Sequence, residues 1–92
     1  MKNALLSPSQ LGGIFREKGL PFNGHHIKYA RRLQSIGTLD ANNLRDRANM
    51  GFSSPTSLQA FTDRLVQAGI AAAFYDAEGK LALVKFIWKG QQ

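Results

Sequence analysis

The sequence predicts an α+β fold in which four short helices precede a C-terminal β-hairpin. Between residues 7 and 69, apolar residues recur every three or four positions, in segments that begin at a helix-capping residue and end at a glycine. After Gly69 this spacing stops. Residues 70–75 and 80–88 are rich in aromatic and β-branched side chains, and residues 76–79 between them suit a tight turn with Gly79 in the left-handed conformation. We therefore expect the helices first and a hairpin last.

The length and composition indicate one globular domain over residues 1–92. A chain of 92 residues buries a single core, and its hydrophobic fraction of 43% and charged fraction of 20% are ordinary for a folded protein. The absence of cysteine excludes a disulfide scaffold and a thiolate metal site, and it favours a reducing cytoplasm. We find no apolar run long enough for a membrane span and no signal peptide in residues 1–13. We expect a cytoplasmic protein with no cofactor and no membrane contact.

Capping residues and glycines give the bounds of the first two helices. The first is expected over residues 7–19, where Ser7 and Gln10 have the spacing of a capping box. The second is expected over residues 23–37, with Asn23 as its cap. Its apolar side consists of Ile27, Tyr29, Ala30, Leu33 and Ile36.

Two further helices follow. The third is expected over residues 40–51, with Asp40 as its cap and with Leu39 packed against Leu44 across the start of the helix. The fourth is expected over residues 54–69, with Ser54 as its cap. Its core-facing residues are expected to be Leu58, Phe61, Leu65 and Ala68.

Positive charge is concentrated in the first two-fifths of the chain. Twelve Lys and Arg residues against six Asp and Glu residues give a net charge of +6 and a pI of about 10.2. Residues 1–37 hold six basic residues and one acidic residue, whereas residues 38–92 hold six basic and five acidic residues. This balance is typical of a protein that binds phosphates or acidic surfaces, and it places that binding in the basic helical part, residues 1–37.

The second helix carries the strongest binding signal. Lys28, Arg31 and Arg32, with Ser35, fall three or four positions apart and therefore share the side opposite the apolar residues. We call Lys28, Arg31 and Arg32 the cationic face. Arginine holds phosphate through two parallel hydrogen bonds, so this face suits an RNA or DNA backbone. The residues expected to widen it are Arg16, Lys18, His25 and His26. The alternative is a solvated face that keeps the protein soluble.

Residues 38–88 resemble the winged helix-turn-helix domains. Residues 38–48 look like the first helix of that motif, 49–53 its turn, 54–70 its recognition helix, and the hairpin around 76–79 its wing. The resemblance implies a winged-helix-like fold and DNA contacts from Ser54, Thr56, Ser57, Gln59, Asp63 and Lys80. However, the recognition helix has no net charge, and Gln59 is its one residue suited to a strong base contact.

Other candidate sites give weaker signals. Met50 and Phe52 flank Gly51 in the expected turn, where they either stack on bases or contact a partner, or else are buried and pin two helices together. His25 and His26 point about 100° apart on a helix and have no cysteine or third histidine near them, so we expect no metal site. No catalytic motif is present, and we expect a non-enzymatic protein with no small-molecule substrate.

The whole chain also resembles, in size and character, the small phage-encoded anti-CRISPR proteins that block type I-F surveillance complexes. This resemblance implies an inhibitor that contacts the guide RNA and backbone subunits of a ribonucleoprotein complex, prevents its hybridisation with target DNA, and acts in the cytoplasm of the host bacterium. The cationic face would then supply the phosphate contacts. The alternative is a winged-helix transcriptional regulator whose partner is DNA.

Overall fold

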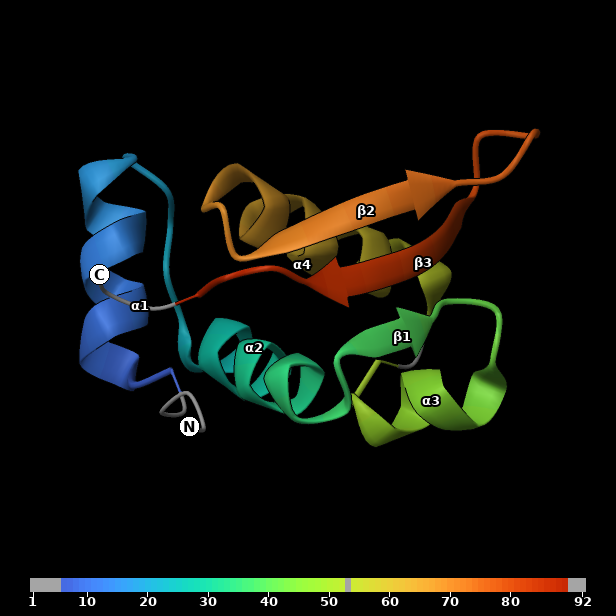
Figure 1. Cartoon of the computed structure of the whole chain (residues 1–92), viewed down its shortest axis with the longest axis horizontal. Helices are drawn as coiled ribbons and strands as arrows, with labels where there is room; N and C mark the ends of the chain where they lie inside the picture. Colours follow the sequence, from blue (N-terminus) through green and yellow to red (C-terminus); the bar gives the residue numbers. More distant parts are fainter. Residues whose placement is uncertain (1–5, 53, 90–92) are drawn as a thin grey trace.

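Four helices and a three-stranded antiparallel sheet make up the part of the chain that the computed structural model describes, residues 6–52 and 54–89. This mixed architecture confirms the predicted α+β class. The elements in chain order are α1 (Pro8–Glu17), α2 (Gly24–Ile36), β1 (Thr38–Asp40), α3 (Leu44–Asn49), α4 (Pro55–Gln67), β2 (Ala71–Tyr75) and β3 (Leu81–Phe86) (Figure 1).

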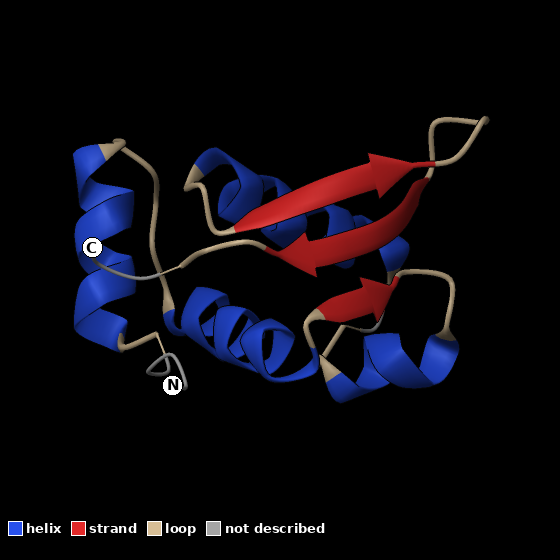
Figure 2. Ribbon diagram, in the orientation of Figure 1, coloured by secondary structure: helices blue, strands red, loops and turns tan. Residues whose placement is uncertain are grey.

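The sheet has the order β1-β3-β2, so the last strand of the chain is its central strand. Strands β2 and β3 form the predicted hairpin, and Gly79 has the expected positive φ of 82° in the turn between them. Helix α4 lies behind the hairpin and α3 lies beside β1 (Figure 2). Helix α2 runs below the sheet, and α1 stands at the end of the molecule remote from the hairpin turn.

Three of the four helices begin at the predicted caps. The Ser7 hydroxyl accepts a hydrogen bond from the Gln10 amide, and the Gln10 side chain accepts one from the Ser7 amide, which completes the capping box of α1. Asn23 caps α2 by accepting from the amide of His25. Ser54 caps α4 by accepting from the amide of Ser57. Local side-chain chemistry therefore fixes where these helices start.

The prediction for the third helix was wrong at its start. Residues Thr38–Asp40 form strand β1, which pairs with β3 so that Leu39 lies opposite Val84. The helix begins three residues later than expected, with Asn43 as the cap that accepts from the Asp46 amide. Leu44 is 70% exposed, so it does not pack against the buried Leu39. Pairing with β3 buries Leu39 in the core, and that gain decides against an earlier helix start.

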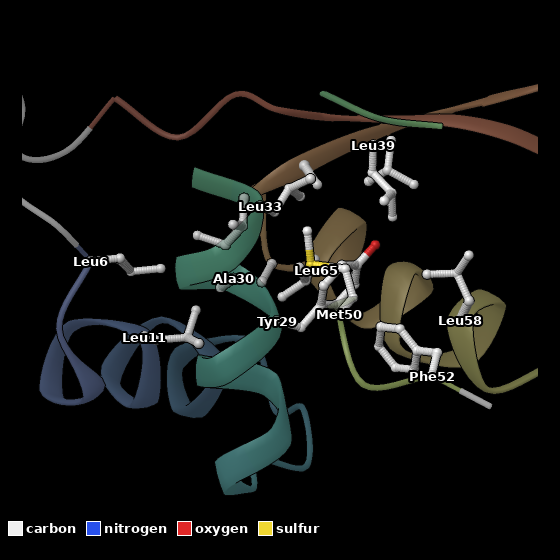
Figure 3. Packing of buried hydrophobic residues seen from close by; sticks show 14 of the residues in the cluster. Leu6, Leu11, Tyr29, Ala30, Leu33, Leu39, Met50, Phe52, Leu58 and Leu65 are labelled. Carbon is white, nitrogen blue, oxygen red and sulfur yellow. The ribbon is translucent and has the colours of Figure 1, made fainter. Parts of the chain in front are cut away.

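One core cluster unites all the elements except α3, and α2 lies at its centre. Figure 3 shows Leu6 and Leu11 on the α1 side of α2, and Leu58 and Leu65 of α4 on the other side. The predicted apolar side of α2 is buried at Tyr29, Ala30 and Leu33, is partly buried at Ile27, and ends before Ile36, which is 51% exposed. Helix α2 is thus packed on two sides.

A buried polar contact joins α2 to α4. The hydroxyl of Tyr29 lies 2.8 Å from Oγ1 of Thr62, and both residues are fully buried. Burial raises the pKa of Tyr29 to about 12, and the hydrogen bond to Thr62 offsets part of that rise. The two hydroxyls satisfy each other in an apolar setting, where an unpaired one is costly.

Removing either hydroxyl alone is expected to destabilise the fold. Tyr29→Phe and Thr62→Val should each lower the free energy of unfolding by about 1–3 kcal/mol, because each leaves a buried hydroxyl without its partner. The double variant should lose less than the sum of the two, since no unpaired hydroxyl remains. Urea unfolding of the four proteins measures this coupling. Strictly additive losses would show that the contact contributes nothing.

Candidate nucleic-acid interface

The cationic face lies on the solvent side of α2. Burial of Tyr29, Ala30 and Leu33 fixes the rotation of the helix, and Lys28 and Arg31 then point into solvent as expected. Within the part of the chain that the structure describes, neither cation forms an ion pair or a hydrogen bond. Both charges are therefore available to an anionic partner.

Arg32 differs from Lys28 and Arg31 because it also makes a hydrogen bond within the fold. Its Nη1 donates a 2.6 Å hydrogen bond to the backbone carbonyl of Asn49, at the C-terminal end of α3. The carbonyls at a helix end have no partner within the helix, and they carry partial negative charge, so a guanidinium stabilises them. Arg32 keeps further N–H groups for a ligand, but its position is fixed by α3.

A hollow of about 400 Å³ opens beside the cationic face, between α2, α4 and the turn that joins α3 to α4. We call it the α2–α4 hollow. Gly51 shapes the turn, because its φ of 88° favours glycine over other residues. The residues that line the hollow are His25, Lys28, Arg32, Met50, Gly51, Phe52, Ser57 and Phe61. Its rim is cationic and its inner wall is aromatic.

The aromatic wall continues into the core as a row of rings. The ring centroids of Phe52 and Phe61 are 5.4 Å apart, and Phe61 lies 5.0 Å from His26. His26 is buried, and its Nδ1 accepts a hydrogen bond from the Asn23 amide, which is part of the α2 cap. Burial lowers the pKa of His26 below its ordinary value of 6.5, and the charges of Arg64 and His25 lower it further.

The lowered pKa of His26 is expected to make the fold less stable in acid. As pH falls through 6.5, the unfolded chain binds a proton at this position before the folded chain does. The contribution of neutral His26 to folding stability is therefore fully present above that pH and is lost below it. His26→Gln keeps an acceptor for the cap and removes the titration. Thermal unfolding between about pH 7 and about pH 5 should show a steeper loss for the wild type than for the variant. Parallel losses would contradict the assignment.

The remaining residues predicted for the basic surface are separated. His25 is exposed and lines the α2–α4 hollow together with Lys28 and Arg32. Arg16 is exposed on α1 and borders a different hollow of about 480 Å³ with Phe22. Lys18 is exposed at the end of α1 and borders neither hollow. His26 is buried and does not belong to the surface.

Met50 and Phe52 are core residues rather than freely exposed contact residues. They are only 7% and 8% exposed, and the Phe52 ring packs at 4.9 Å from that of Tyr29 in an edge-on arrangement. Their burial agrees with the alternative that they pin two helices, rather than with open stacking on bases. Each still reaches the inner wall of the α2–α4 hollow with a small part of its surface.

A second groove separates α4 from the hairpin turn. It has a volume of about 510 Å³, and Thr56, Gln59 and Lys80 line it together with Arg47. Gln59 is already engaged, because its Nε2 donates to the Asp63 carboxylate at 2.9 Å and to the Tyr75 hydroxyl at 3.0 Å. Sequence reasoning missed Arg47, which has no spacing relation to Lys80 along the chain. Ser54 and Ser57 serve the cap of α4 instead.

No family model, curated protein or solved structure matches this chain. Among the described residues, no group of three or more His, Cys, Asp or Glu side chains is placed to hold a metal ion. None of the described helices is long and apolar enough to cross a membrane. The candidate site therefore rests on the geometry and charge of α2 and its neighbours.

The two adjacent arginines are expected to differ in their effect on stability. Arg32→Ala should lower the free energy of unfolding by about 1 kcal/mol, because the α3 carbonyl loses its charged partner at an exposed site. Arg31→Ala removes the same charge and no such contact, and it should leave stability within about 0.5 kcal/mol of the wild type. Urea unfolding of both variants measures the difference. Equal stabilities would mean that the Arg32 contact has no net value.

Proposed function

We propose that this protein is a non-enzymatic binding protein that holds a nucleic-acid backbone through the cationic face of α2. The observation that supports this proposal is the pair Lys28 and Arg31, which project from a rigid helix with no carboxylate partner among the described residues. Arg32 adds a third cation whose position is set by its bond to Asn49. Phosphate binding releases condensed counterions, so three cations on one side of a helix give a large, salt-dependent gain in affinity.

We propose further that the bound nucleic acid belongs to a nucleoprotein complex. Helix α4 is the element that would read bases in a helix-turn-helix protein, yet its Gln59 amide is occupied by Asp63 and Tyr75. The charge lies on α2 instead, where it meets backbone rather than base edges. An inhibitor of an RNA-guided surveillance complex, as the resemblance to anti-CRISPR proteins suggests, needs backbone and protein contacts but no base readout.

A second candidate function is a winged-helix transcriptional regulator. The element order supports it, because β1 pairs with β3, α3 packs beside β1, and α4 packs against strand β2 of the hairpin that would be the wing. The groove that holds Arg47 and Lys80 would then receive the DNA. Substituting both by Ala abolishes duplex binding under this candidate function and leaves binding intact under the first.

Loss of the exposed cations is expected to weaken binding and its dependence on salt. Lys28→Ala with Arg31→Ala should reduce the slope of log affinity against log salt by about 1 for each phosphate contact removed. A matched control is Lys85→Ala with Lys89→Ala, which removes the same charge from exposed positions on β3 and after it. Binding is measured at two salt concentrations against RNA, duplex DNA and purified RNA-guided complexes.

The outcomes separate the candidates. Binding to the complex that is lost in the α2 variant and kept in the control supports the inhibitor. Equal losses in both variants would mean that net charge alone drives binding, which contradicts a site on α2. Tight, sequence-selective binding to free duplex DNA would contradict the inhibitor and favour the regulator.

A further inference from the structure

We infer that the α2–α4 hollow binds an unpaired nucleobase while the cationic face holds the phosphates on either side of it. This inference rests on the proposed function and adds a ligand class to it: single-stranded or flipped-out nucleotides rather than an intact duplex. The observation behind it is the hollow and the residues that line it, and these do not include Arg31, which lies on the outer side of the helix.

The inner wall of the hollow suits a flat aromatic ligand. Phe61 is partly buried and presents its ring, and the ring of Phe52 lies 5.4 Å from it at a tilt of 41°. A base that enters the hollow exchanges water for these apolar and aromatic surfaces, which is the usual source of affinity for single-stranded nucleic acid. The volume of about 400 Å³ is within the range of small-ligand sites.

The rim of the hollow suits a phosphate and the polar edge of a base. Lys28 and Arg32 lie on the α2 side, so a backbone that follows this helix passes both cations at the mouth. The guanidinium of Arg32 is held in place by Asn49, so binding orders it less than it would a free side chain. Across the hollow, the Ser57 hydroxyl on α4 accepts a hydrogen bond from the Ser54 hydroxyl at 3.2 Å and keeps its own proton to donate to the base edge.

This arrangement discriminates between paired and unpaired nucleotides. In a duplex the bases are stacked inside, and only sugars and phosphates meet a helix that lies along the strand. A base reaches the wall formed by Phe61 and Phe52 only after it leaves the stack, which costs much more free energy in a duplex than in a single strand. The hollow therefore adds more affinity for single strands and flipped-out nucleotides than for an intact duplex.

The test compares two single-stranded oligonucleotides of about ten residues, one with all its bases and one with abasic sites at its centre, so that the phosphates are the same. The wild type should bind the complete strand about tenfold more tightly. Ser57→Phe fills the hollow without removing a cation, and it should reduce this ratio to about one while affinity for the abasic strand is kept. Ala60→Phe is the control, because Ala60 is exposed on α4 and lines neither the α2–α4 hollow nor the groove at the hairpin turn.

A second variant tests the aromatic wall independently, in case the Phe inserted at position 57 disturbs the packing of α4. Phe61→Leu retains an apolar wall without the aromatic ring, and it should also lower the preference for the complete strand. Quenching of 2-aminopurine placed at the centre of the strand reports base stacking directly and should be lost in both variants. Equal wild-type affinity for the two strands would overturn the inference and leave the proposed function intact, because phosphates alone would then be bound. Failure to bind either strand or any nucleic acid would overturn both.

Discussion

Helix α2 is buried on two sides, against α1 and against α4 with the sheet, and it lies at the centre of the core cluster. The ring of Phe15 on α1 packs 5.0 Å from that of His26, whereas Tyr29 reaches Thr62 on α4. Both contacts fix the rotation of the helix about its axis. Because the buried side is fixed, the solvent side is fixed as well, and its cations project in a defined direction.

The sequence predicts the local features of this fold well, because capping and turn formation depend on neighbouring residues. Ser7, Asn23 and Ser54 each cap a helix, and the hairpin turn has its glycine where expected. Strand β1 cannot be predicted in this way, because three residues are too few to show an alternation of apolar and polar residues. Its partner strand β3 also lies more than forty residues further along the chain. Asp40 also resembles a helix cap, since its carboxylate accepts from the Asn42 amide in a local turn.

The candidate site is predictable only in part. Spacing alone placed Lys28, Arg31 and Arg32 on one side of a helix, and all three are exposed there. The bond from Arg32 to Asn49 crosses between elements, and the hollow beside it is built from three segments, so neither has a signature in the sequence. Burial of Met50 and Phe52 also depends on how the turn between α3 and α4 packs against α2 and α4, where Phe52 contacts Tyr29 and Phe61. Only the tertiary structure places the cationic face beside a hollow with an aromatic wall.

The bond between Arg32 and the α3 carbonyl has a consequence for how this surface changes over generations. Lys28 and Arg31 make no hydrogen bond or ion pair in the described fold, so a substitution at either leaves the core unchanged. A change at Arg32 alters the end of α3 at the same time. Substitutions on this surface are therefore constrained unequally: the two cations without partners tolerate exchange, and Arg32 is the residue whose loss the protein must compensate elsewhere.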